Sequence, residues 1–330
     1  MELSPLARTF INRFQGGFPL HEERPFAVIA EQLDTNEDAL LSLIRDLNHE
    51  GLLSRFGPIY NASLLGGAQT LAAMQVPEKR FREVADIVNA VPEVAHNYRR
   101  ENQLNMWFVV ATADAVGVAP TLQRIEQATG LRVYDFPKLH EFYLGLWLVV
   151  DERGAVDTAP VPENVGHSGQ PQQLDTIDRR IIAATQSGLP LVAAPLANLA
   201  EQLQLQLSTV TTRMQRMHRS GAIRRIGAVP NHYRLGLCCN GMSVWDVPDE
   251  LAVGLGERVG ALDFVSHSYL RPRHPGVWRY NLFAMVHGTR QDEVQGKIEQ
   301  IAALLSPHCR GHDVLFSSEI LKKTGLRLAA

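Results

Sequence analysis

The feature that most constrains the fold of this chain is a sequence repeat that spans half of it. Residues 51–61 read GLLSRFGPIYN and residues 221–231 read GAIRRIGAVPN, with both glycines and the final asparagine in the same places. Further along each half, VAHNY at residues 94–98 parallels VSHSY at residues 265–269. Repeats of solenoid proteins recur about every 20 to 50 residues. A period of half the chain instead indicates a duplicated set of domains.

The beginning of each half predicts a winged helix-turn-helix. Between residues 174 and 219 apolar residues recur at the spacing of helices that bury one face. Ser208 is a favourable N-cap for the third helix, Gly221 ends it, and the apolar run 223–229 predicts a strand of the wing. Residues 10–60 repeat this pattern less regularly. Three short helices followed by a hairpin wing are typical of a winged helix-turn-helix.

The remainder of each half predicts a ferredoxin-like domain. Strand and helix patterns follow one another in the order βαββαβ, which is the split βαβ arrangement. In the first half, the expected elements are residues 70–73, 80–89, 94–98, 106–112, 118–129 and 142–150. In the second half, they are residues 241–245, 250–259, 264–269, 281–287, 292–305 and 314–316.

The expected fold class is therefore α+β, a tandem repeat of a winged helix-turn-helix and a ferredoxin-like domain. A stretch rich in Pro, Gly and polar residues divides the halves and predicts an exposed linker. The expected domains are winged helix-turn-helix 1 (1–62), ferredoxin-like domain 1 (63–150), the linker (151–173), winged helix-turn-helix 2 (174–232) and ferredoxin-like domain 2 (233–330).

The predicted hairpin of each ferredoxin-like domain begins with a polar cluster. In the second half it consists of His267, Tyr269 and Arg271, ahead of a Pro/His/Gly turn. The echo in the first half consists of His96, Tyr98 and Arg99. A single histidine on a strand is usually a packing residue. A histidine that recurs two residues before a tyrosine in both halves favours a chemical role.

Charge argues against nucleic acid as the main partner. The chain has 45% hydrophobic and 20% charged residues, as soluble globular proteins do, and a net charge of −3. DNA-binding proteins usually carry a basic excess, because neutralised phosphates supply much of the affinity. The helix predicted at residues 36–50 is acidic, whereas the corresponding helix of the second half carries Arg213, Arg216 and Arg219. Such unlike helices suit packing better than the reading of two matched half-sites.

Other sequence features restrict the location and the cofactors. The N-terminal MELSPLARTF lacks the pattern of a signal peptide, and no apolar run is long enough to span a bilayer, so the expected location is the cytoplasm. The three cysteines lack the spacing of a zinc site or a disulfide framework. No glycine-rich phosphate loop or HExxH motif occurs, and no cofactor is expected.

Several segments of the sequence resemble known families. LDTID (174–178), LANLA (196–200), LSTVTTR (207–213) and GAI (221–223) resemble the Lrp/AsnC family, in which a winged helix-turn-helix precedes a ferredoxin-like effector domain. The hairpins HNYRRE…NMWF and SHSYLRP…WRYNLFAMVHG are similar to the siroheme decarboxylases, a branch of this fold in haem d1 and alternative haem biosynthesis. This resemblance implies the loss of CO₂ from the C12 and C18 acetates of siroheme, which gives 12,18-didecarboxysiroheme.

The resemblance implies roles for the repeated polar residues. His267 and His96 are candidate acids that protonate the carbon from which CO₂ departs, and Tyr269 and Tyr98 are expected to relay or orient that proton. Either histidine is alternatively an axial ligand of the siroheme iron, which arrives with the substrate. The cluster of the second half is richer and is the expected working site, which residues of the first half can complete.

Siroheme carries eight carboxylates, so a binding site needs several cations and hydrogen-bond donors. Aromatic rings can stack on the macrocycle. The candidate substrate-binding residues are Arg99, Arg100, Asn105, Trp107, Lys138, His140, Arg271, Arg273, Trp278, Arg279, Asn281 and His287. Each also has a plainer interpretation: solvated arginines, aromatic rings of the core, and asparagines that hold a hairpin.

Two other functions stay open at this point. One is an Lrp/AsnC-like transcription regulator with a domain that senses a small molecule or haem. The other is a tetrapyrrole carrier without catalytic activity. The expected partners are siroheme and either a second copy of the chain, in a homodimer, or related subunits, because the enzymes that the sequence resembles have paired, related subunits.

Overall fold

The computed structural model describes residues 3–112, 114, 116–163, 165 and 173–323. The helices are α1 (Pro5–Arg13), α2 (Pro25–Glu31), α3 (Glu37–His49), α4 (Phe81–Ala90), α5 (Val118–Thr129), α6 (Thr176–Thr185), α7 (Pro195–Leu203), α8 (Leu207–Arg219), α9 (Ala252–Gly260) and α10 (Gln291–Leu305), with short 3₁₀ helices η1 (Ala62–Leu65) and η2 (Glu78–Arg80).

The strands of the described residues follow in chain order. They are β1 (Leu53–Tyr60), β2 (Ala68–Met74), β3 (Val94–Arg100), β4 (Met106–Thr112), β5 (Val133–Phe136), β6 (His140–Leu144), β7 (Trp147–Val150), β8 (Val156–Ala159), β9 (Ile223–Pro230), β10 (Cys239–Asp246), β11 (Val265–Leu270), β12 (Leu282–Gly288) and β13 (Gly311–Lys323).

Local sequence explains most of the helix starts. The Asn36 side chain caps α3, and Asp175 and Asp178 form a capping box at the start of α6. The start of α8 differs from the prediction, because its N-cap is Gln206, which makes no side-chain capping hydrogen bond. The predicted cap, Ser208, therefore lies inside the helix. Among the described helices, none is long and apolar enough to cross a membrane.

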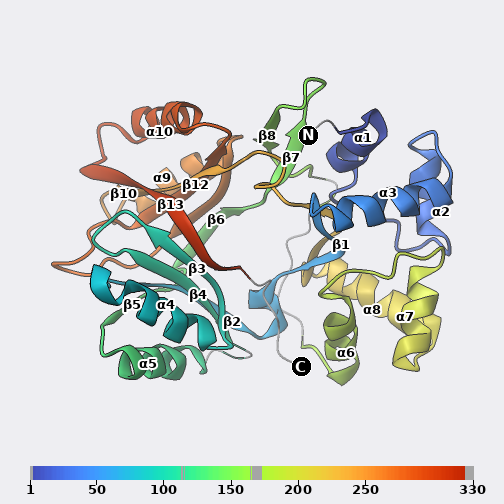
Figure 1. Cartoon of the computed structure of the whole chain (residues 1–330), viewed down its shortest axis with the longest axis horizontal. Coiled ribbons are helices and arrows are strands. Elements are labelled where there is room, and N and C mark those ends of the chain that lie inside the picture. Colours follow the sequence, from blue (N-terminus) through green and yellow to red (C-terminus); the bar gives the residue numbers. More distant parts are fainter. Residues whose placement is uncertain (1–2, 113, 115, 164, 166–172, 324–330) are drawn as a thin grey trace.

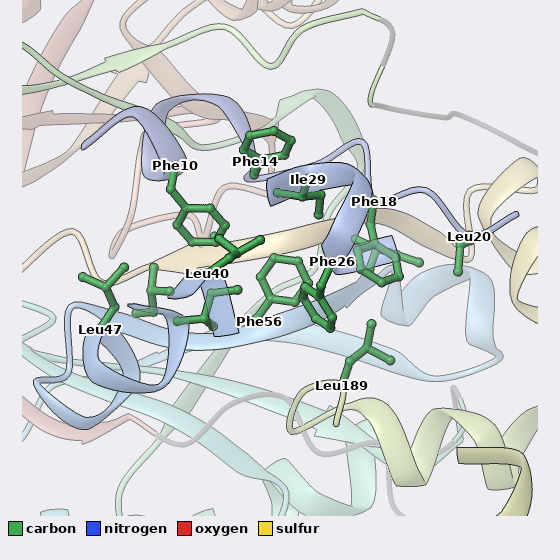
Figure 2. Packing of buried hydrophobic residues seen from close by; sticks show 14 of the residues in the cluster. Phe10, Phe14, Phe18, Leu20, Phe26, Ile29, Leu40, Leu47, Phe56 and Leu189 are labelled. Carbon is green, nitrogen blue, oxygen red and sulfur yellow. The ribbon is translucent and has the colours of Figure 1, made fainter. Parts of the chain in front are cut away.

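The two helix-turn-helix domains pack into one unit around a shared apolar core (Figure 1). Its centre is a group of phenylalanines, in which the ring centroids of Phe26 and Phe56 are 5.3 Å apart and those of Phe18 and Phe56 are 5.6 Å apart. Figure 2 shows Leu189 of the second half pointing toward these rings from the opposite side. The core is therefore built from both repeats.

The wings of the two domains pair with each other. Strand β1 runs antiparallel to β9, with Phe56 opposite Ala228 and Gly57 opposite Gly227. The predicted hairpin within each domain is therefore wrong, because each domain supplies one strand and finds the partner for its open edge in the other repeat. Gly227 in β9 allows the backbone at Phe14 to approach the strand closely, since a Cβ there would lie 2.4 Å from the carbonyl oxygen of Phe14.

Of the other described strands, nine form one sheet in the order β5-β2-β4-β3-β13-β10-β12-β11-β6, and β7 pairs with β8 in a separate two-stranded sheet. Within the nine-stranded sheet, β5-β2-β4-β3 and β13-β10-β12-β11 are two copies of the same four-stranded, ferredoxin-like arrangement. The helices α4 and α5 cover one copy, and α9 and α10 cover the other (Figure 1). The predicted fold class is confirmed.

The two copies are interlocked by their last strands. The first part of β13 pairs with β10, and its second part, from Ser317, pairs with β3 of the other half. In the same way β5 pairs with β2, and β6, which follows after three residues, pairs with β11. The last strand of the first ferredoxin-like domain is thus β5 and not the predicted segment 142–150. The exposed edge of each copy is covered by the other.

Strand β7, just before the predicted linker, holds the first helix in place. Strand β8, which lies in the predicted linker 151–173, pairs with β7. The Asn12 side chain of α1 bonds both backbone groups of Val150 at 2.8 Å, and Gln15 bonds both of Leu148 at 2.7 and 3.0 Å. The first part of the predicted linker is therefore structured, and much of its second part lies outside the described residues.

Candidate active site

The two histidines that begin the polar clusters occupy equivalent positions. His96 follows a register shift in β3, and His267 follows one in β11, so each comes directly after a β-bulge. Bulges are common beside active sites, because they re-aim a side chain. Each histidine thereby starts a row of alternate residues on the face of the sheet that is turned away from the helices.

The alternation corrects one member of the first-half cluster. Asn97 donates a hydrogen bond to Asn89 of α4, and the Arg99 guanidinium lies 4.4 Å from the ring centroid of Phe81, so these residues face the helices. Arg99 also bonds Glu78 at 2.8 Å. The row on the opposite face consists of His96, Tyr98 and Arg100, which corresponds to His267, Tyr269 and Arg271 in the second half.

Arg100 and Arg271 are equivalent in their contacts too. Arg100 donates to the carbonyl oxygen of Leu315, and Arg271 donates to that of Phe136. Burial lowers the pKa of both arginines to about 10, so both are charged at neutral pH. In the described structure, the Nε atom of each is buried without a hydrogen-bond partner. Each arginine therefore has a buried donor that is not satisfied within the described structure.

His267 belongs to a chain of hydrogen bonds that sets its tautomer. The Asn240 amide donates to the Leu237 carbonyl, which turns its Oδ1 toward Nδ1 of His287. This oxygen only accepts, so His287 carries its proton on Nδ1 and accepts at Nε2 from the Ser266 hydroxyl at 2.7 Å. Nδ1–H of His267 then donates to the same hydroxyl oxygen at 2.7 Å. The Nε2 atom of neutral His267 is left with a free lone pair.

Burial keeps these imidazoles neutral. Desolvation lowers the pKa of His267 to about 4, where Glu141 acts in the opposite sense to Arg224, Lys138 and Arg271. Desolvation and the neighbouring Lys323 lower the pKa of His96 to about 4. His287 likewise has a pKa well below its ordinary value because it is buried. In the unliganded protein the histidines are therefore bases and potential metal ligands rather than ready acids.

Residues between the two clusters were missed by the sequence analysis. Lys323 lies opposite His96, and its ammonium is 4.3 Å from the ring centroid of Tyr233. The ring of His232 lies 5.5 Å from that of His287. His232 and Tyr233 thus connect the two polar rows. A signal was present in the sequence, since NHY at 231–233 stands where the first half has NAS at 61–63.

The row in the second half also has an ionic network. Lys138, a predicted residue, bonds Glu141 at 2.7 Å, and Arg224 from the wing strand β9 bonds the other carboxylate oxygen at 3.1 Å. Glu141 lies opposite Tyr269, whose ring centroid is 5.6 Å from the Lys138 ammonium. Glu141 and Arg224 were also missed, because they belong to different domains and share no local motif.

Several predicted binding residues have other roles. Trp107 and Trp278 lie in an apolar cluster built from both four-stranded copies of the sheet, 0% and 4% exposed, with ring centroids 5.0 Å apart. The Trp107 indole donates to the Leu104 carbonyl at 2.7 Å. Packed on both sides, these rings have no free face for a macrocycle. The structure therefore corrects their predicted stacking role to one in packing.

The two predicted asparagines hold the hairpins. The Asn105 side chain bonds both backbone groups of Val76, at 2.8 and 2.9 Å. In the second half, the Asn281 side chain bonds both backbone groups of Val247, at 3.2 and 3.0 Å, and also the carboxylate of Asp249. Their polar groups are occupied within the protein, so the role that the structure gives them is structural.

The outer cations and one histidine also point elsewhere. Arg273 and Arg279 both pair with Asp246, at 2.7 and 2.6 Å, at the end of β10. His140 is exposed, and its ring lies 4.6 Å from that of Phe142, which packs against α9 on the helix-covered face. The structure brings none of these three residues into the row of His267.

Comparisons with known proteins agree with this architecture. The family model described as AsnC-like ligand binding domain matches residues 65–143 and 234–322, and that of the siroheme decarboxylase NirDL-like HTH domain matches residues 8–53 and 178–224. The siroheme decarboxylase NirDL subunit of Paracoccus denitrificans is 32% identical over 335 residues, which cover 100% of this chain and 99% of that protein. The chain belongs to the siroheme decarboxylase family.

Other family members match about half of the chain or nearly all of it. The siroheme decarboxylase NirH subunit of Paracoccus pantotrophus is 60% identical over 154 residues, 47% of this chain but 96% of that subunit. The crystal structure of the siroheme decarboxylase NirDL has a TM-score of 0.70 and 28% identity, covering 97% of this chain and 92% of that one. The same values hold for NirDL in co-complex with an iron-uroporphyrin III analogue.

In this family member, the described residues contain no group of three or more His, Cys, Asp or Glu side chains placed to hold a metal ion. The free Nε2 of His267 and the buried, unpartnered Nδ1 of His96 are nitrogens that can face an iron atom supplied by a ligand. The axial role of either histidine stays a prediction.

Proposed function

We propose that this chain decarboxylates siroheme at the acetate side chains on C12 and C18 and releases 12,18-didecarboxysiroheme. Each step replaces the carbon–carboxylate bond by a carbon–hydrogen bond: CO₂ leaves, the bonding pair stays on the methylene carbon, and one proton is added there. No electron is gained or lost, and no resident cofactor is needed, because the macrocycle delocalises the electron pair. The iron is part of the substrate.

The observation that carries this proposal is the His267 row with its hydrogen-bond chain. A decarboxylase of this kind needs a proton donor beside the reacting carbon and cations for the remaining carboxylates. The free Nε2 of His267 can take up a proton when an anionic substrate arrives, since nearby carboxylates favour the imidazolium. The chain through Ser266 to His287 holds the ring in position while Nε2 gains and releases the proton.

The cations of the site suit binding better than they suit the departure of CO₂. A guanidinium held on the reacting carboxylate would stabilise the substrate more than the transition state. We therefore assign Arg271, Arg100 and Lys138 to carboxylates that are retained. Tyr269 and Tyr98, beside the histidines, are assigned to orienting the reacting acetate and its proton.

The structure gives no specific support to the regulator alternative. On α8, Arg213 bonds the carboxylate of Asp178 at 3.1 Å, and Arg216 also pairs with Asp178. Arginines that are already paired within the protein have less to offer a phosphate backbone.

The partners follow from the fused halves. The nine-stranded sheet joins both halves within one chain, and the NirH relative corresponds to about half of it. We infer that the two halves make the pairing that separate related subunits would make between chains. The homodimer expected from the sequence stays a proposal, and the sedimentation of the purified chain tests it.

Anaerobic incubation of the purified chain with siroheme tests the activity. The expected product is lighter than siroheme by two molecules of CO₂ in mass spectrometry, with a monodecarboxylated species at early times. If the mass is unchanged while the absorbance spectrum of siroheme shifts, the chain is a carrier. Tight, salt-sensitive binding to a palindromic duplex without any turnover would favour a regulator.

A further inference from the structure

One carboxylate stands among the cations of the site. Glu141 bonds the Lys138 ammonium at 2.7 Å and the Arg224 guanidinium at 3.1 Å, and it lies opposite Tyr269 on the neighbouring strand. Its side chain is 29% exposed, and those of Lys138 and Arg224 are 16% and 26% exposed. The trio is therefore partly open to solvent, in the same row as His267.

This arrangement is at odds with a polyanionic substrate if it is fixed. A carboxylate at this position repels incoming carboxylates and uses two cations that the substrate needs. Those two cations, however, converge on a single carboxylate with one hydrogen bond to each of its oxygens. That is also the geometry in which a lysine and an arginine bind the carboxylate of a ligand.

We propose that Lys138 and Arg224 form a binding pair for one retained carboxylate of the tetrapyrrole, and that Glu141 occupies this pair until the substrate carboxylate replaces it. The inference rests on the proposed function, since it names the groups that bind its substrate. Arg224 belongs to wing strand β9. The second helix-turn-helix domain is thereby part of the substrate site, which gives it a role other than DNA binding.

The exchange is energetically mild. Glu141 keeps the cations ordered in the empty site, because two converging cations without an anion repel each other. One carboxylate replaces another on the same two cations, so the net cost of the exchange is the difference between two similar ion pairs. The displaced side chain can turn toward solvent, where its charge is hydrated.

The test is the affinity for iron-uroporphyrin III, which carries the same eight carboxylates and is titrated by absorbance without any turnover. Glu141→Gln keeps the shape of the side chain and removes the competing charge. Its matched control is Glu93→Gln, since Glu93 is 30% exposed and paired with Arg124 on the helix-covered side. Arg224→Gln is matched by Arg124→Gln. Each control changes the net charge by the same amount as its matched variant and leaves the site unchanged.

We expect Glu141→Gln to bind about fivefold more tightly than the wild type and Arg224→Gln about tenfold more weakly, with little change in either control. In the double variant Glu141→Gln/Arg224→Gln, most of the gain from the first substitution should disappear. Glu141→Ala should also bind more tightly, and circular dichroism confirms that each variant is folded.

The outcomes separate the inference from the function on which it rests. One outcome would overturn the inference alone: the wild type binds iron-uroporphyrin III, but folded Glu141→Gln and Glu141→Ala bind it no more tightly. Glu141 would then support the site rather than compete for it. An equal gain in Glu93→Gln would also overturn it, as an effect of net charge. A wild type that neither binds iron-uroporphyrin III nor converts siroheme overturns the proposed function and the inference with it.

Discussion

His96 and His267 occupy the same place in the two halves, each directly after a β-bulge, but their cross-strand partners differ. Lys323 lies opposite His96, whereas Leu144 lies opposite His267. Burial together with nearby cations lowers the pKa of both histidines to about 4, but only His267 has the hydrogen bond to Ser266 that holds its ring. The duplicated scaffold thus presents two chemically unlike histidines, and His267 is better placed to gain and deliver a proton.

The first prediction concerns these two histidines. His267→Ala should lower the turnover of siroheme by about 100-fold or more, the usual contribution of a positioned acid or base, with little loss of affinity for iron-uroporphyrin III. His96→Ala should reduce turnover less. Single-turnover mass spectrometry and absorbance titration measure the two quantities. Equal losses of binding and turnover in His267→Ala would instead indicate an iron ligand or a structural role.

The second prediction concerns the hydrogen bond that positions His267. Ser266→Ala removes the acceptor for Nδ1–H of His267 and the donor to His287. We expect kcat to fall about tenfold with KM almost unchanged, because the ring loses its orientation and not its contact with the substrate. The imidazole ¹⁵N shifts should also reveal a mixed tautomer of His267, whereas Ser266→Thr should restore one. Unaltered ¹⁵N shifts in Ser266→Ala would contradict this role.

The third prediction tests the packing role of Trp107. Its indole is fully buried in the apolar cluster that both copies of the sheet share, so Trp107→Ala should cost about 3–5 kcal/mol in the free energy of unfolding. Trp107→Phe should fold and bind iron-uroporphyrin III with the affinity of the wild type. Urea unfolding and absorbance titration provide the two measurements. A large loss of affinity in folded Trp107→Phe would revive the stacking role that the sequence predicted.

Much of the fold could be predicted because its signals are local. Helical periodicity, strand alternation and the half-chain repeat gave the order of elements, and the structure confirms the tandem α+β fold. The pairing of β1 with β9, and of each last strand with the other half, joins segments far apart in the chain. No local pattern encodes such pairing, and a hairpin within one domain fits the same alternation.

The candidate site divides in a similar way. His267, Tyr269 and Arg271 could be predicted from the sequence because they recur as a motif. The two-residue period of a strand would also have predicted Arg100, and not Arg99, as the third member of the first-half row. Glu141 and Arg224 come from separate domains, so their meeting depends on the tertiary structure. The aromatic and asparagine residues of the hairpins were over-interpreted, because burial decides between packing and binding and is not visible in composition.

The last prediction concerns acid stability and follows from the buried histidines. Burial lowers the pKa of His96, His232 and His267 to about 4, whereas an exposed histidine in the unfolded chain has a pKa of about 6.5. Between these values the unfolded chain binds more protons than the folded protein, so the free energy of unfolding must fall as the pH falls. Their contribution is complete above pH ~6.5 and is lost by pH ~4.

Each histidine can contribute on the order of 3 kcal/mol over this range, so urea unfolding at pH 7.5, 6 and about 5 should resolve the loss. His232→Gln should flatten the pH dependence, while His21→Gln, at a side chain that is 74% exposed, should leave it as steep as in the wild type. Carboxylates in ion pairs lose their stabilising contribution mainly below this range, because their pKa values are lowered, as for Asp175 at about 2. Equal unfolding free energies at pH 7.5 and 5 would mean that the imidazoles take up protons in the folded protein as they do in the unfolded chain, and His267 would then be protonated at pH 5 before the substrate arrives.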